Sequence, residues 1–160
     1  MIECTEFIIS LKLEEYNPAR LLEEVLGKAF KAEIEKDNIH MLDTHETDDP
    51  LYPSFLEVCW DEQKLGLGEY ADIEVAEKLH QKKKINAIIS HYGLIGNLDP
   101  EDPYWCLVHE NGKWYFGDNC DTILGHFSNG SPGIGKVEEL DLKKLLARKY
   151  VWVDLGLKCL

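Results

Sequence analysis

The sequence predicts an α+β fold built around one hydrophobic core. Segments with alternating or continuous apolar residues, typical of strands, are interspersed with segments whose apolar residues recur every three or four positions, as on amphipathic helices. The 160 residues, of which 44% are hydrophobic, are enough for one domain with a sizeable core. No repeat and no linker divides the chain, so a single domain is expected over residues 1–160.

The first two elements follow from local signals. An apolar run followed by alternation predicts a strand over residues 3–13. A helix is expected to begin after Asn17, because the Asn side chain can cap free N–H groups and Pro18 has no N–H to lose at the first helical position. Apolar residues at helical spacing continue this helix to about residue 36.

Four further elements complete the first half of the chain. Strands over residues 39–44 and 55–60 flank a loop rich in Asp and Pro. A helix over residues 69–83 ends in lysines, which the helix dipole favours, and an apolar strand follows at residues 85–90. The resulting βαββαβ order over residues 1–92 resembles that of ferredoxin-like sandwiches, in which two helices cover one face of an antiparallel sheet.

The second part of the chain extends this order. Asn111-Gly112 separates two aromatic runs, at residues 104–109 and 113–117, and an Asn-Gly pair between such runs is a strong signal for a tight β-hairpin. The hairpin is expected to be followed by a glycine-rich loop, an amphipathic helix and a last strand, at residues 125–135, 140–149 and 150–157.

The charge of the chain limits its partners. The formal net charge is −13, and residues 1–62 hold 16 of the 30 acidic but only 5 of the 17 basic residues. Such a surface repels phosphate backbones and anionic membranes and attracts cations, so we expect neither nucleic acid nor membrane as a direct partner. No apolar run has the length of a membrane span and the N-terminus is acidic, which favours a cytoplasmic location.

The five cysteines are scattered and include no C-x-x-C pair. This pattern differs from those of disulfide scaffolds and zinc ribbons, and we expect free thiols in a reducing compartment. Cys106 lies in an apolar run, where burial makes a thiol unreactive.

These observations predict a small acidic binding protein rather than an enzyme. The specific hypothesis is an inhibitor or immunity-type protein that masks a basic nuclease, toxin or other enzyme acting on nucleic acid, because carboxylates can occupy the places of phosphates. An ordinary solvated acidic surface is the alternative. Aromatic anchors among carboxylates are typical of interfaces, and the predicted protein-binding residues are Asp43, Glu46, Asp48, Asp49, Tyr52, Trp60, Asp61 and Glu62.

A different hypothesis is enzymatic. His45-Glu46-Thr47 and His126-Phe127-Ser128 share the pattern H-x-[ST] and resemble the paired motifs of two-histidine phosphoesterases. That resemblance implies that His45 and His126 act as general base and general acid on a phosphoester. The carboxylates beside His45 would repel the phosphate, so this hypothesis ranks second.

Two other patterns match known site motifs only in part. The histidines and carboxylates of residues 40–49 are possible metal ligands but have no metal-motif spacing, so no metal or cofactor is expected. Residues 130–136 (GSPGIGK) resemble a phosphate-binding loop before a helix, but Val137 replaces the Ser or Thr that would bind magnesium. We therefore expect no ATPase activity.

Overall fold

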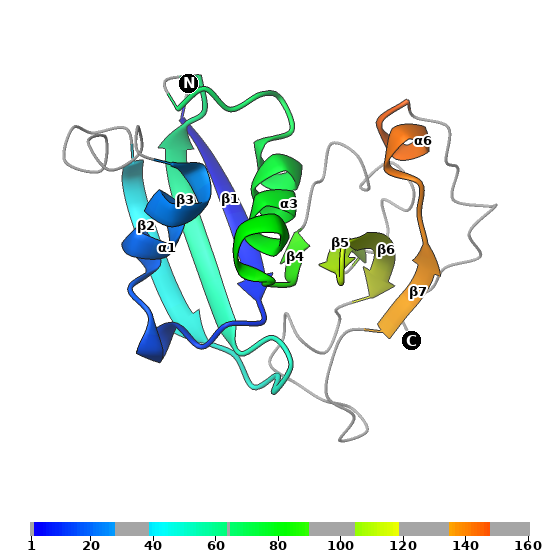
Figure 1. Ribbon diagram of the computed structural model, residues 1–160, viewed down its shortest axis with the longest axis horizontal. Helices are drawn as coiled ribbons and strands as arrows, with labels where there is room; N and C mark the ends of the chain where they lie inside the picture. Colours follow the sequence, from blue (N-terminus) through cyan, green and yellow to red (C-terminus); the bar gives the residue numbers. More distant parts are fainter. Residues whose placement is uncertain (1, 28–38, 64, 90–104, 119–134, 148–160) are drawn as a thin grey trace.

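The computed structural model describes residues 2–27, 39–63, 65–89, 105–118 and 135–147 (Figure 1). The strands in these residues are β1 (Ile2–Ile9), β2 (Ile39–Glu46), β3 (Ser54–Asp61), β4 (Ala87–Ile89), β5 (Trp105–Glu110), β6 (Lys113–Asp118) and β7 (Gly135–Glu139). The helices are the short 3-10 helix η1 (Leu13–Glu15) and the α-helices α1 (Pro18–Leu26), α3 (Ala71–Lys83) and α6 (Leu142–Leu146).

All the described strands belong to one antiparallel sheet, in the order β2-β3-β1-β4-β5-β6-β7. The first four strands have the connectivity of the ferredoxin-like arrangement, with α1 and α3 on the same side of the sheet (Figure 1). Strands β5, β6 and β7 then continue the sheet beyond β4. The α+β fold class predicted from the sequence is therefore confirmed.

The main core lies between the sheet and its helices. Side chains alternate between the two faces of a strand, so every second residue of β1 and β3 points to the helices. Phe7 and Trp60 meet there edge to face, with ring centroids 6.3 Å apart. The largest fully buried side chains of this core are Trp60, Phe7, Phe116, Ile9, Leu21, Leu22, Leu56, Leu79 and Ile89.

Helix α1 begins where the sequence predicts and ends earlier. The Asn17 side chain accepts a hydrogen bond from the Arg20 N–H at 3.1 Å. The helix ends at Leu26 because Gly27 adopts a left-handed conformation with φ 95°, a conformation that glycine tolerates without steric cost. The predicted extension to residue 36 is wrong at Gly27, and residues 28–38 lie outside the described part of the chain.

Charged side chains connect the two long helices. Glu24 of α1 forms an ion pair with Lys83 of α3 and accepts a hydrogen bond from the Tyr16 hydroxyl. Hydrogen bonding to Lys83, and then to Tyr16, lowers the pKa of the Glu24 carboxyl to about 2. The Lys83 ammonium also lies 5.6 Å from the centre of the Tyr16 ring.

The hairpin is confirmed, but the segments that follow it differ from the prediction. Asn111 and Gly112 both have positive φ, at 51° and 83°, as a type I′ turn requires. Strand β7 occupies the end of the expected glycine-rich loop and the residues after it. It pairs with β6. Helix α6 is shorter than the predicted 140–149, and the last predicted strand, 150–157, lies outside the described residues.

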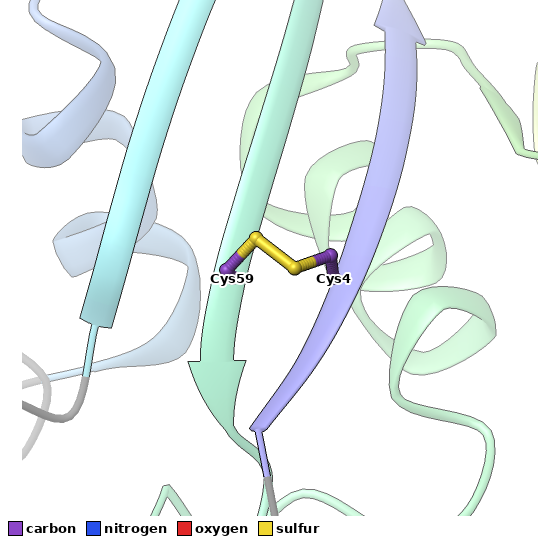
Figure 2. Close-up of a disulfide and its surroundings, with 2 residues drawn as sticks. All are labelled: Cys4 and Cys59. Atoms are coloured by element: carbon purple, nitrogen blue, oxygen red, sulfur yellow. A yellow bond between two sulfur atoms is a disulfide. The ribbon is translucent and has the colours of Figure 1, made fainter.

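Cys4 on β1 and Cys59 on β3 form a disulfide across adjacent strands (Figure 2). They are direct partners in the register, with Cα atoms 4.0 Å apart, close to the spacing of a non-hydrogen-bonded antiparallel pair. The expectation of free thiols is wrong for these two residues, because strand pairing joins positions 55 residues apart. Cys106 is free and buried as expected. Cys120 and Cys159 lie outside the described residues.

We predict that reduction of this disulfide lowers the free energy of unfolding by roughly 4 kcal/mol, because the bond closes a long loop in the unfolded chain. Urea unfolding of the wild type with and without a phosphine reductant measures the difference. The variant Cys4→Ser, at an exposed position, is expected to match the reduced wild type and to be insensitive to the reductant. Equal stability of oxidised and reduced wild type would contradict the prediction.

Candidate acidic binding site

The eight residues predicted to bind a partner do not share one exposed face. Asp43, Glu46 and Asp48 are exposed and Glu62 is half-buried. The remaining four, Asp49, Tyr52, Trp60 and Asp61, are buried. The expected exposure of those four residues is therefore wrong.

Strand geometry explains this outcome. Trp60 points to the helices and is 0% exposed, so it belongs to the core. Ser54, the first residue of β3, pairs with Glu46, whereas Asp61 is the last residue of β3 and Glu62 follows it. Eight strand residues span about 23 Å at roughly 3.3 Å per residue. The two acidic segments are thus at opposite ends of the sheet.

Tyr52 packs on the outer face, which we define as the face of the sheet turned away from α1 and α3. It lies with Ile8, Ile88, Cys106 and Val108 in a small apolar cluster. Burial, followed by the nearby carboxylates of Glu110 and Asp49, raises the pKa of the Tyr52 hydroxyl far above its usual value. Tyr52 therefore anchors the β2–β3 loop and is not available to a partner.

A row of carboxylates crosses the outer face at β2, β3 and β1. The register pairs Asp43 with Glu57 and Glu57 with Glu6, so three carboxylates follow one another at the interstrand spacing of about 4.8 Å. Desolvation by burial and the adjacent Glu57 raise the pKa of Glu6, and His45 partly opposes them. We call Asp43, Glu57 and Glu6 the acidic row. The disulfide is the next cross-strand pair beyond it on the same face.

Next to the acidic row, an open pocket of about 440 Å³ lies at the end of the sheet where β1 and β2 finish and β3 begins, the lower edge in Figure 1. We call it the acidic pocket. Its charged lining consists of Lys12, Glu14, His45, Glu46, Asp48 and Asp49.

Among the carboxylates of this lining, Asp49 is buried, at 1% exposed, whereas the others are exposed. The two oxygens of Asp49 have different surroundings. Its Oδ1 accepts hydrogen bonds from the N–H groups of Leu51, at 2.8 Å, and Tyr52, at 3.2 Å. Its Oδ2 is buried and has no hydrogen-bond partner among the described residues.

Sequence analysis missed Glu6, Glu14 and Glu57. Each lies outside the densest acidic segment, in a stretch with ordinary local composition. The ferredoxin-like order does predict that β1 and β3 are neighbours, but it does not give the register that aligns Glu6 with Glu57.

The two-histidine hypothesis receives no geometric support. His45 is exposed and stacked on Phe55, with ring centroids 4.3 Å apart. His126 lies outside the described residues. The acidic lining around His45 disfavours a phosphate there.

The phosphate-loop pattern is also not matched where the structure describes it. A helix should follow the loop, but Lys136 and Val137 lie on strand β7. Among the described residues, no group of three or more His, Cys, Asp or Glu side chains is placed to hold a metal ion. None of the described helices is long and apolar enough to cross a membrane.

A second cavity, of about 270 Å³, lies between α3 and the β5–β6 hairpin. It is lined by His80, His109, Glu77 and Trp114, and the Trp114 indole N–H donates to Glu77 Oε1 at 3.1 Å. His109 is 4% exposed, and its Nδ1 has no hydrogen-bond partner among the described residues. Burial lowers the pKa of His109; the nearby His80 also lowers it, while Glu77 raises it.

Comparisons of the chain with protein-family models, with curated proteins and with solved structures find no match. The geometry and charge of this chain are therefore the basis for inferring its function.

We predict that Glu57→Gln lowers the pKa of Glu6, because it removes the like charge directly opposite. A titration of side-chain carboxyl signals by NMR measures this pKa. Asp43→Asn is the matched control and should change the Glu6 pKa less, since Asp43 lies one strand further away and its charge is more strongly screened. A Glu6 pKa that is the same in Glu57→Gln and wild type would show that the two carboxylates do not interact.

We predict that the fold loses stability as the pH falls below about 6.5, the ordinary pKa of histidine. His109 has a lowered pKa in the folded protein, so the unfolded chain binds the proton more readily at acid pH. This residue contributes at most about 1.4 kcal/mol per pH unit, the linkage value for one proton. Urea unfolding between pH 7.5 and 5.5 should give a shallower pH dependence for His109→Gln than for the wild type. Equal slopes for wild type and His109→Gln would rule out this source of acid sensitivity.

Proposed function

We propose that the protein binds a basic protein through the acidic row and the adjoining acidic pocket. The observation that carries the proposal is the alignment of Asp43, Glu57 and Glu6 across three strands. Like charges directly opposite each other in a sheet are destabilising. A cationic partner removes this repulsion on binding, so the row costs stability in the free protein and contributes affinity in the complex.

The partner that fits this surface best is an enzyme or toxin with a nucleic-acid-binding groove. Carboxylates about 4.8 Å apart form a line of negative charge comparable to the phosphates of one strand, which follow at about 3.4 Å along the helix axis. A groove that binds phosphates would also bind such a line. The proposed activity is therefore that of an inhibitor or immunity-type protein that masks the groove, with charge complementarity accelerating association.

We predict that neutralising the acidic row slows association with the basic partner about tenfold or more at low salt. The test variant, which we call the row-neutral variant, combines Glu6→Gln, Asp43→Asn and Glu57→Gln. Basic proteins captured from a native lysate by the wild type are identified and purified. Their association rates with both proteins are then measured at increasing salt, together with their nuclease activity in the presence of each.

A control variant separates a local effect from the effect of net charge. Glu69→Gln, Glu74→Gln and Glu139→Gln remove the same number of charges from positions away from the row. This control should associate nearly as fast as the wild type. Equal association rates for the row-neutral variant and the control would overturn the proposal. So would a lysate experiment in which the row-neutral variant captures every basic protein that the wild type captures, or in which the wild type captures none.

A further inference from the structure

Asp49 lines the acidic pocket, and its buried Oδ2 has no hydrogen-bond partner among the described residues. A buried carboxylate is costly unless its oxygens are paired or hydrogen-bonded. Among the described residues, Asp49 accepts hydrogen bonds only at Oδ1, from two N–H groups of its own loop. A cation that enters the pocket and donates to Oδ2 would remove this cost.

The charges around Asp49 select a cation. Glu14, Glu46 and Asp48 are exposed at the pocket and outnumber Lys12 and His45. The pocket volume of about 440 Å³ is large enough for an organic group. The described residues include no cluster placed to bind a metal ion, which favours an organic cation over an inorganic one.

The shape of the lining favours a planar group. Leu13, Pro50 and Pro53 contribute apolar surface to the pocket beside the carboxylates. A guanidinium group is flat, offers five N–H donors in a fixed fork and is weakly hydrated, whereas an ammonium group is compact and strongly hydrated. Charge-assisted bonds from guanidinium to carboxylate are also frequently bidentate.

We infer that the acidic pocket binds one guanidinium group, with Asp49 as the carboxylate that receives it. The source of that group, an arginine side chain of the basic partner, rests on the proposed function. The chemistry of the pocket does not depend on the partner and is tested without it.

The probe is N-acetyl-L-arginine amide, which carries the guanidinium and no other charge. NMR titration of the wild type should shift amide signals of residues 44–54, with a dissociation constant on the order of 1 mM. N-acetyl-L-lysine amide should bind at least threefold more weakly. Absence of arginine amide binding, or equal binding of the two amides, would overturn the inference.

Two substitutions assign the binding to the pocket. Asp49→Asn keeps an oxygen for the two loop N–H groups and replaces Oδ2 by a donor, so affinity should fall at least tenfold. Lys12→Gln removes the opposing positive charge and should increase the affinity. Asp72→Asn, which alters another buried carboxylate on α3, is the matched control and should leave affinity unchanged. Wild-type affinity in Asp49→Asn would also overturn the inference.

The same probe separates this inference from the proposed function. The row-neutral variant keeps Asp49 and its pocket, so it should still bind arginine amide while it loses the basic protein. If arginine amide binds through Asp49 but the row-neutral variant keeps full affinity for every basic protein, the proposed function fails and the pocket assignment stands. If the row-neutral variant loses the basic protein but Asp49→Asn binds arginine amide as the wild type does, the proposed function stands and the pocket assignment fails.

Discussion

The register between β1 and β3 is the constraint on which the rest of the structure depends. These are neighbouring strands in the interior of the sheet, and eight residue pairs join them. Because side chains alternate with a period of two, a slip by one residue would move every side chain to the opposite face. If β1 slipped against β3, Phe7 would leave the core and Glu6 would enter it. The Cys4–Cys59 disulfide fixes this register covalently.

The two faces of the sheet have different roles. The face toward α1 and α3 holds most of the buried apolar side chains. Among the described residues, the outer face carries a small apolar cluster in which Tyr52 packs with Ile8 and Ile88. At β2, β3 and β1 the same face carries the acidic row, so one strand pairing supplies both core packing and a charged surface. The disulfide joins β1 and β3 (Figure 2). In the register it is the next pair on this face after the like-charged pair Glu6 and Glu57.

Asp49 and His109 are buried polar groups that the described residues leave incompletely bonded. Both line cavities, one at the end of β2 and the other under the β5–β6 hairpin. Their physical consequences differ. Asp49 is surrounded by other carboxylates, which favours a cationic ligand. Burial favours the neutral form of His109, which makes the fold sensitive to acid.

Local sequence signals determined the types and order of the main elements as far as the β5–β6 hairpin, but they did not predict strand β7. The Asn17-Pro18 start of α1 and the Asn111-Gly112 turn depend on conformational preferences of a few adjacent residues, and both are visible without the fold. The excess of acid in the first 62 residues likewise predicts a negative charge on the surface of this part of the molecule.

Only the tertiary structure decided which carboxylates share a surface. Asp43, Glu57 and Glu6 come from three strands, and their alignment is a property of non-local pairing that no local pattern specifies. The same holds for the disulfide. Trp60 and Tyr52 were expected on the surface but lie in buried clusters. In the sequence, an aromatic residue beside carboxylates has the same pattern whether it anchors a partner or belongs to the core. The burial of Trp60 depends on which face of the sheet its position on β3 points to, and the burial of Tyr52 depends on the course of the β2–β3 loop. Both are fixed only when the sheet assembles.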